Sequence, residues 1–525
     1  MPCALFCYSR DANESERLRE MLFNSGTFLL FFPIVTLLYF LLPQKVRWVW
    51  LLVASYYFYM CWEPVYALLM LASTAVTYLS GLVIGHYAGD GDAKPRQQGM
   101  QKLAVALSCI LNLGILCFFK YFDFLADNLC SLLALAGIQL TRPSFSILLP
   151  VGISFYTFQA LGYTMDVYRG NISVERNFFR YALFVSFFPQ LVAGPIERSG
   201  NLLRQLRTPT TVNYDRIRRG LMMMLWGYFL KMVISDRAAI IVNYVYANFE
   251  RYAGLTIAFA TIMFAIQIYC DFGGYSAIAI GAAQVLGFDL CQNFRQPYFA
   301  TSVADFWHRW HISLSTWFRD YLYIPMGGSR KGKLRKWLNV LITFLVSGLW
   351  HGANWSYVLW GGLNGVMQVI GEWKNLLLAK GKGFLTQKGW KEPESARSFS
   401  ARLLKTLITF CLICITWVFF RAESAQQGFQ ILRQMFLSWN PWILFDDTLI
   451  SIGLGQTDLF WLLASIGVLF CVDLLHEKGC HLRDSLLRQQ FWFRLLIYML
   501  GIFSILLLGV YGPNMDASAF IYFQF

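Results

Sequence analysis

Residues 305–355 read DFWHRWHISLSTWFRDYLYIPMGGSRKGKLRKWLNVLITFLVSGLWHGANW. Three of the chain's six histidines, His308, His311 and His351, fall in this stretch. The apolar run 337–350 ends directly before His351, which predicts an imidazole at the end of a membrane-buried helix. A titratable side chain at that depth is costly and usually serves function. An imidazole titrates near neutral pH and can take a proton from an alcohol, which is a basic requirement of acyl transfer to a hydroxyl.

The composition excludes an ordinary soluble globular protein. Of the 525 residues, 57% are hydrophobic and only 14% are charged, and the mean hydropathy is +0.47. Apolar runs of membrane-spanning length recur, as at 103–119, 403–420 and 459–472. We therefore predict an all-α, polytopic integral membrane bundle with roughly eleven to thirteen apolar segments.

The net charge of +14 admits two interpretations. Basic residues concentrate in the short connections 198–219, 330–336 and 374–405, as the positive-inside rule expects of cytoplasmic loops. A binding site for a polyanion is the alternative. We favour the positive-inside rule as the explanation of the charge and assign these connections to the cytoplasm. Membrane lipid, but no nucleic acid, is the expected partner.

Polar residues interrupt several apolar segments. In 150–169, Gln159 stands with serine and threonine among aromatic residues, which fits either a wet cavity wall or hydrogen bonding between helices. The proline- and glycine-containing segment 187–198 predicts a broken, re-entrant piece. Asp271, among aromatics and glycines, requires a partner, and either orients a cavity group or anchors the structure.

The motifs of other site classes are incomplete here. The turn 327–334 resembles a phosphate-binding loop but lacks the Ser or Thr after its lysine, so we interpret it as a tight basic turn, with contact to donor phosphates as the alternative. No histidine has an aspartate at H-x-x-x-x-D spacing, and no compact metal-ligand motif is present, so we expect no metal. A continuous helix would place His308 and His311 on a shared face, and Arg319–Asp320 predicts a local ion pair.

The chain resembles a known enzyme family. FWHRWHISLSTWFRDYLYIPMGG (306–328) and GLWHG (348–352) are similar to motifs of the membrane-bound O-acyltransferase family, in its bacterial branch typified by alginate O-acetyltransferase. The resemblance implies a single membrane domain over 21–525, preceded by a polar extension at 1–20, with tilted and re-entrant helices around a central tunnel. It also implies that His351 is the catalytic base and His311 a second essential residue. Trp350, Asp271 and Gln159 are the expected tunnel and substrate residues.

The reaction implied by the resemblance is transfer of an acyl group, most simply acetyl, from a cytoplasmic thioester such as acetyl-CoA or an acyl carrier to an exported polysaccharide. No bound cofactor is expected. An SGNH-type extracytoplasmic acyltransferase is the expected partner, and a bacterial cytoplasmic membrane the expected location. The alternatives are D-alanyl transfer to teichoic acid and an export component that forms no bond.

The terminal sequence AFIYFQF (519–525) has two interpretations. Aromatic residues often anchor a chain at the membrane interface. A similar aromatic motif ends a companion protein of the related D-alanylation machinery, and this resemblance implies that Tyr522, activated by His351, is an acyl relay.

Overall fold

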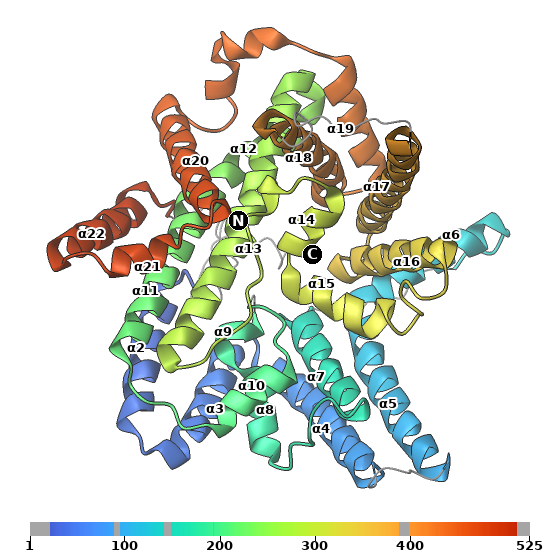
Figure 1. Cartoon of the computed structure of the whole chain (residues 1–525), viewed down its shortest axis with the longest axis vertical. Coiled ribbons are helices and arrows are strands. Elements are labelled where there is room, and N and C mark those ends of the chain that lie inside the picture. Colours follow the sequence, from blue (N-terminus) through green and yellow to red (C-terminus); the bar gives the residue numbers. More distant parts are fainter. Residues whose placement is uncertain (1–20, 89–94, 141–148, 193, 388–397, 512–525) are drawn as a thin grey trace, which may run out of the picture. The chain divides into compact units, whose positions relative to one another are not determined.

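The computed structural model describes residues 21–88, 95–140, 149–192, 194–387 and 398–511. Within these ranges the regular structure is helical and contains no β-strand (Figure 1). The predicted all-α fold is therefore confirmed. The polar extension 1–20 lies outside the described residues, and the prediction of a single domain over 21–525 stays a prediction.

Serine side chains start several of the helices, because a hydroxyl oxygen can accept a hydrogen bond from an otherwise unpaired amide of the first turn. Ser25 accepts from the Phe28 amide at 3.2 Å, and Ser302 accepts from the Asp305 amide at 3.1 Å. Ser398 does the same for α18. Local sequence thus fixes where these helices begin.

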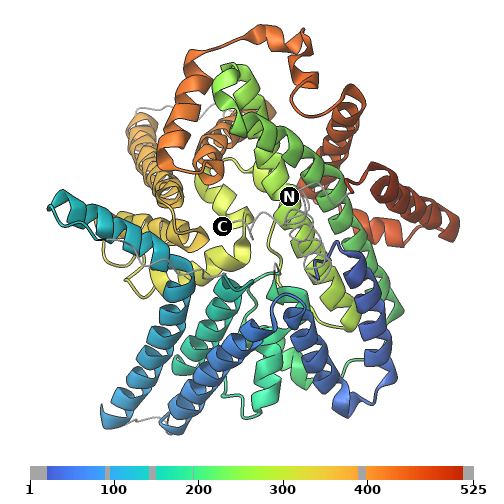
Figure 2. The same cartoon turned by 180° about the vertical axis from the view of Figure 1, so that it is seen from behind.

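Contacts between residues divide the chain into two compact units. Unit 1 comprises 1–224 and 277–291, and unit 2 comprises 225–276 and 292–525. In unit 1, α4 packs against α5 and α7, and α8 lies against α3 and α10 (Figures 1 and 2). The helices that lie wholly within unit 1 are α2 (Gly26–Leu41), α3 (Gln44–Met60), α4 (Pro64–His86), α5 (Pro95–Leu116), η1 (Cys117–Tyr121), α6 (Phe122–Leu135), α7 (Ile153–Tyr168), α8 (Phe178–Ser186), α9 (Phe188–Leu191) and α10 (Ser199–Arg207).

Two helices, α11 (Tyr214–Tyr228) and α13 (Gly254–Leu286), contribute to both units. In unit 2, α16 and α17 form an antiparallel pair, and α14 packs against α17 and α18. Its remaining helices are η2 (Phe229–Ser235), α12 (Asp236–Ala247), η3 (Phe249–Arg251), η4 (Pro297–Phe299), α14 (Val303–Arg309), α15 (Ile312–Phe318), η5 (Arg319–Tyr323), α16 (Lys333–His351), α17 (Trp355–Gln387), α18 (Phe399–Arg421), α19 (Ala425–Leu437), η7 (Pro441–Leu444), η8 (Asp447–Ile450), α20 (Gln456–Glu477), α21 (Leu482–Leu487) and α22 (Phe491–Leu508).

Six helical stretches among the described residues are long and apolar enough to cross a membrane. Leu507, on α22, is 77% exposed, as expected of a side chain that meets lipid. The chain is thus a multi-pass membrane protein. The six are fewer than the apolar segments predicted, because several segments form shorter or more polar helices. The six stretches are Pro64–His86, Gln97–Leu135, Gly254–Leu286, Phe399–Arg421, Gln456–Glu477 and Phe491–Leu508.

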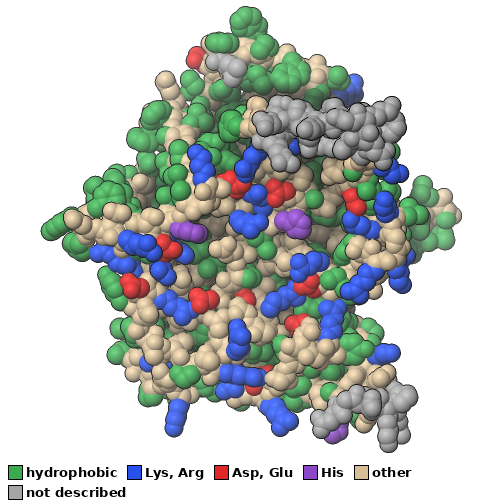
Figure 3. All heavy atoms as spheres, in the orientation of Figure 1, with side chains coloured by type: hydrophobic (Ala, Val, Ile, Leu, Met, Phe, Trp, Pro, Cys, Tyr) green, Lys and Arg blue, Asp and Glu red, His purple; other side chains and the backbone are tan. Residues whose placement is uncertain are grey.

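Two local predictions are confirmed. The segment 187–198 is broken as predicted, since α8 ends at Ser186 and α9 spans only four residues. The basic segment 327–332 is a turn, in which Gly327, Gly328 and Gly332 have positive φ angles. Lys and Arg side chains lie over much of the face in Figure 3, and apolar side chains gather along its margins.

Candidate active site

His351 is the last residue of α16, as the apolar run predicted. The pairing of α16 with α17 depends on glycine at close contacts between the two helices. A Cβ atom at Gly348 would lie 2.2 Å from the carbonyl oxygen of Tyr357, and one at Gly361 would lie 2.2 Å from that of Phe344. Larger residues would separate the helices, so these glycines hold the end of α16 in place.

Aromatic rings surround the imidazole of His351. Ring centroids of Trp350, Trp360 and Phe420 lie 4.9, 5.0 and 5.3 Å from its own. His351 is only 5% exposed. The rings exclude water from one side of the imidazole, which strengthens electrostatic interactions there.

His311 occupies a break between two short helices. α14 ends at Arg309, Trp310 is extended, and His311 has a φ of +43° before α15 begins. The prediction that His308 and His311 share one helical face is therefore wrong. His308 is exposed, whereas His311 is buried.

Asn293 holds the ring and the backbone around His311. Its Oδ1 lies 3.2 Å from Nδ1 of His311 and accepts hydrogen bonds from the Ser313 hydroxyl at 2.8 Å and amide at 3.3 Å. A backbone amide can only donate, so this Asn293 atom is the oxygen. Nδ1 of His311 consequently carries the proton, and Nε2 is the basic nitrogen of the neutral ring.

Burial lowers the pKa of His311 to about 3, and the residue lies outside the candidate membrane spans. The ring of Phe272 stands edge-on to it, with centroids 4.6 Å apart. Because desolvation penalises the imidazolium form, the ring stays neutral at physiological pH. It can then accept a hydrogen bond through Nε2.

The indole ring of Trp350 lies close to the rings of both histidines. Its ring centroid lies 6.2 Å from that of His311 and 4.9 Å from that of His351. The structure therefore brings together three of the predicted site residues, although His311 precedes Trp350 and His351 by 39 and 40 positions in the sequence. Two buried imidazoles therefore pack against the same indole ring.

The other predicted site residues have structural contacts. Asp271 forms an ion pair with Lys231 at 2.7 Å, and Lys231 also contacts Asp236 at 2.8 Å. This fits the anchoring interpretation of Asp271. Gln159, in unit 1, donates to the carbonyl oxygen of Phe184 at 2.6 Å, which fits hydrogen bonding between helices. Tyr522 lies outside the described residues.

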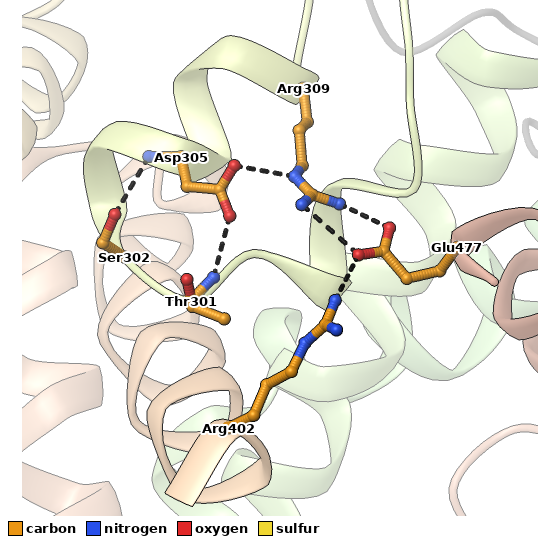
Figure 4. Close-up of polar contacts among 6 residues, drawn as sticks. All are labelled: Thr301, Ser302, Asp305, Arg309, Arg402 and Glu477. Carbon is orange, nitrogen blue, oxygen red and sulfur yellow. Dashed lines mark hydrogen bonds and ion pairs between the residues drawn. The ribbon is translucent and has the colours of Figure 1, made fainter. Parts of the chain in front are cut away.

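A cluster of charged residues fixes the end of α14, two residues before His311 (Figure 4). Arg309 pairs with Asp305 at 2.8 Å and with Glu477 of α20 at 2.7 Å, and Arg402 of α18 reaches Glu477 at 2.6 Å. Burial alone would lower the pKa of Arg309, but hydrogen bonds to both carboxylates raise it. We call Asp305, Arg309, Arg402 and Glu477 the Arg309 cluster.

A cavity of about 320 Å³ lies beside the site within unit 2. Its walls come from α14, α15, η5, α16 and α17, and include Ser347, one helical turn before His351. His308, Arg319 and Lys336 line it alongside apolar side chains. The predicted Arg319–Asp320 ion pair is confirmed at 2.8 Å. Lys336 is also paired, with Glu372 at 2.6 Å, so the cavity combines apolar walls with two cations that already have carboxylate partners.

Sequence reasoning assigned no role to Asn293, Lys231 or the Arg309 cluster. Asn293 and Lys231 contact His311 and Asp271, which are 18 and 40 positions away in the sequence, so no local pattern reveals these pairs. Across the described residues, no group of three or more His, Cys, Asp or Glu side chains is arranged to hold a metal ion.

Comparisons with known proteins identify the family of the chain. The model of the membrane-bound O-acyltransferase family matches residues 171–373. The probable alginate O-acetylase AlgI of Pseudomonas syringae pv. tomato is 37% identical over 81% of this chain and 76% of its own length. The peptidoglycan O-acetyltransferase of Helicobacter pylori is 31% identical over 80% of each chain. The teichoic acid D-alanyltransferase of Bacillus subtilis is 25% identical over 54% of this chain and 71% of its own.

Proposed function

The chain belongs to the membrane-bound O-acyltransferase family and is an O-acyltransferase, and we propose that it transfers an acetyl group from a thioester donor to a hydroxyl of an exported bacterial polysaccharide. The single observation that carries this proposal is the pair of buried imidazoles that pack against Trp350. The acetyl group and the polysaccharide acceptor are supported by two relatives, an alginate O-acetylase and a peptidoglycan O-acetyltransferase, at 37% and 31% identity.

In the proposed reaction, His351 is the general base. The acceptor oxygen attacks the thioester carbonyl, its proton passes to His351, and the carbon–sulfur bond breaks to release the thiolate, which takes up that proton. His311 accepts a hydrogen bond through Nε2 from a neighbouring hydroxyl of the acceptor and so positions the reacting one beside His351. Trp350 and Trp360 keep water from the thioester, which would otherwise be hydrolysed.

The donor is proposed to enter through the cavity beside α16. An acyl thioester carried on coenzyme A or on an acyl carrier joins an uncharged arm to phosphate groups. The cavity offers apolar walls for the arm, and Arg319 and Lys336 line it. Both cations are paired, with Asp320 at 2.8 Å and with Glu372 at 2.6 Å, so the donor anion would share them with these carboxylates. Basic residues of the neighbouring turn, Lys331 and Lys333, are exposed, which supports a cytoplasmic position by the positive-inside rule.

The remaining parts of the proposal concern the route of the acyl group. A bacterial cytoplasmic membrane is supported by the bacterial relatives, and an SGNH-type partner would complete transfer outside. Tyr522 would carry the acyl group as an ester between the two enzymes. The second candidate, D-alanyl transfer to teichoic acid, is supported by the weaker and shorter match to a teichoic acid D-alanyltransferase.

The test measures acetyl esters on exported polysaccharide in a strain lacking the gene and complemented with each variant. We expect His351→Ala to lower ester content by about a hundredfold or more, since general base catalysis contributes that much. His481→Ala is the matched control, because His481 is exposed and lies at the start of α21. Membrane levels of all variants are compared by immunoblotting.

Each outcome has a defined meaning. Loss in both His351→Ala and Tyr522→Phe supports a tyrosine relay, whereas loss in His351→Ala alone supports direct transfer. Wild-type ester content in His351→Ala would contradict its assignment as base and would favour an export component. If deletion of the gene leaves acetyl esters unchanged, the polysaccharide proposal is wrong, and D-alanyl esters on teichoic acid are the next product to measure.

A further inference from the structure

Unit 1 contains a second cavity, of about 340 Å³, that the proposed reaction does not use. It lies where α3 begins, beside α8 and the end of α10. Four cationic side chains line it: Lys45, Arg47, Arg180 and Arg207. We call this cavity the basic pocket.

The positive charge of the basic pocket exceeds the negative charge near it. Glu175 is buried and pairs with Arg207 at 2.8 Å and with Arg180 at 3.6 Å. Among the described residues, no ion pair involves Lys45 or Arg47, although both line the pocket. Four cations and one carboxylate leave a formal excess of three positive charges. Such an excess attracts an anion.

The cations are held in place before any ligand arrives. Arg47 donates to the carbonyl oxygens of Thr210, Leu42 and Phe40 at 2.7, 2.9 and 3.1 Å. The guanidinium of Arg180 lies over the ring of Trp48, 5.7 Å from its centroid. Little side-chain freedom is lost when a ligand binds such groups, which favours binding.

The pocket lies at the polar end of a helix that otherwise presents apolar side chains. α3 begins with Gln44, Lys45 and Arg47 around the pocket, while Val46 and Val53, on the opposite face of the helix, are 42% and 55% exposed. An exposed apolar face next to a cationic first turn is the pattern of a helix that enters the bilayer at headgroup depth. The amides of its first turn add positive potential at the same place.

From these observations we propose that the basic pocket binds the phosphate group of an anionic phospholipid. The net charge of the pocket distinguishes this ligand from a zwitterionic lipid, whose choline or ethanolamine group would meet the same cations. The hydroxyl of Thr210, which also lines the pocket, can accept from the Tyr39 hydroxyl and donate to a phosphate oxygen. The pocket thereby recognises lipid rather than the reacting acyl group.

The test measures binding of phosphatidylglycerol and phosphatidylcholine to the purified full-length protein in detergent, by native mass spectrometry over a lipid titration. The double variant Lys45→Gln/Arg207→Gln removes two pocket cations. The control Lys102→Gln/Arg204→Gln removes the same charge from two exposed residues outside the pocket, Arg204 being on α10 itself. Thermal unfolding in phosphatidylcholine alone checks that both variants are folded.

We expect phosphatidylglycerol to bind more tightly than phosphatidylcholine, and the pocket variant to weaken phosphatidylglycerol binding by about thirtyfold. The control is expected to change it by less than about twofold. Equal weakening by both double variants would assign the preference to overall charge and overturn the proposal, as would equal affinity for the two lipids.

Two further arms separate the possible sources of phosphate. Coenzyme A and inorganic phosphate are added separately to the protein bound to phosphatidylglycerol. The proposal expects neither to displace the lipid at micromolar concentration. Displacement by coenzyme A would assign the pocket to the donor, and displacement by inorganic phosphate would assign it to the free anion. Either result overturns the lipid assignment.

Discussion

The Arg309 cluster in unit 2 and the basic pocket in unit 1 differ in how their charges are balanced. Arg309 meets two carboxylates, Asp305 and Glu477, and its side chain is 13% exposed. In the basic pocket, Glu175 pairs with Arg180 and Arg207, and the other two cations, Lys45 and Arg47, form no ion pair among the described residues. Balanced and largely buried charges hold helices together, whereas an accessible excess of one sign recruits a ligand.

This difference has a physical consequence for each region. In the Arg309 cluster, removal of one partner leaves another charge buried without its counterpart, which is costly. In the basic pocket, removal of Lys45, which forms no ion pair among the described residues, leaves less repulsion among the remaining cations. Substitutions in the first region should therefore impair the folded enzyme, and substitution of Lys45 should impair only binding.

The largest effect is expected at Asn293, which fixes the ring of His311 next to the Arg309 cluster. Asn293→Ala removes the acceptor for Nδ1–H, so the ring can adopt the other tautomer and lose its basic Nε2. We expect the turnover rate to fall by about a hundredfold, with little change in the KM for the thioester donor. Rates of ester formation at limiting and at saturating donor concentration distinguish a change in turnover rate from a change in KM.

Asn293→Asp is the control for that prediction, because a carboxylate keeps the accepting oxygen. It should retain more activity than Asn293→Ala, and its pH–rate profile should shift, since a negative charge stabilises imidazolium. A rise in KM without loss of turnover in Asn293→Ala would show that Asn293 shapes donor binding instead.

A smaller loss is expected at Arg309. Arg309→Gln leaves Asp305 and Glu477 without their shared cation, and the end of α14 beside His311 moves. We expect about tenfold less activity, since small displacements of a catalytic group are costly, and a lower unfolding temperature. Arg402→Gln removes the exposed arginine on the same Glu477, at 59% side-chain exposure. It should have little effect, because exposed ion pairs contribute little. Equal losses would contradict the distinction between buried and exposed partners.

The sequence predicted the parts of the site that depend on local pattern. The apolar run before His351 specified a helix that ends at that residue, and the glycines of 327–332 specified a turn. The error at His308 and His311 has a physical cause. A positive φ at a histidine is locally unfavourable, and here the carbonyl of Asn293 helps to enforce it by accepting from the Ile312 amide at 2.9 Å. That contact spans 19 residues, which no local pattern reveals.

The partner of Asp271 shows the same limit. An acid among apolar residues predicted that a counterpart exists, but not that it is Lys231. The π-helical stretch η2 shifts the register of its helix at this lysine. The basic pocket likewise combines three separate segments, around residues 45, 180 and 207. Charge counting along the sequence attributed Arg207 to topology, assigned no role to the cations near residues 45 and 180, and missed their convergence.

The next prediction concerns pH and the buried imidazole. In the folded protein the pKa of His311 is about 3, whereas an exposed histidine has a pKa near 6.5. Between these values the unfolded chain binds a proton that the folded chain does not, so stability falls as pH decreases from about 6.5. The loss approaches about 1.4 kcal/mol per pH unit. Above pH 6.5 this residue contributes no pH dependence.

His311→Asn tests that prediction, because its amide can still donate to Asn293 but does not titrate. Unfolding temperatures of wild type and variant are compared between pH 4.5 and 7.5. The wild type should lose more stability than the variant on acidification. If the unfolding temperatures of wild type and variant fall in parallel on acidification, His311 takes up a proton in the folded protein as it does in the unfolded chain.

The smallest effect that we predict is a difference between the basic pocket and the Arg309 cluster in their response to salt. Raising the NaCl concentration from about 0.05 to 0.5 M shortens the Debye length several-fold, which screens the accessible basic pocket more than the buried Arg309 cluster. The rise in unfolding temperature caused by phosphatidylglycerol should be about halved. The difference in unfolding temperature between wild type and Arg309→Gln, measured in phosphatidylcholine, should stay the same. If salt instead abolishes that second difference, Arg309 acts as a surface charge, and the distinction drawn from charge balance fails.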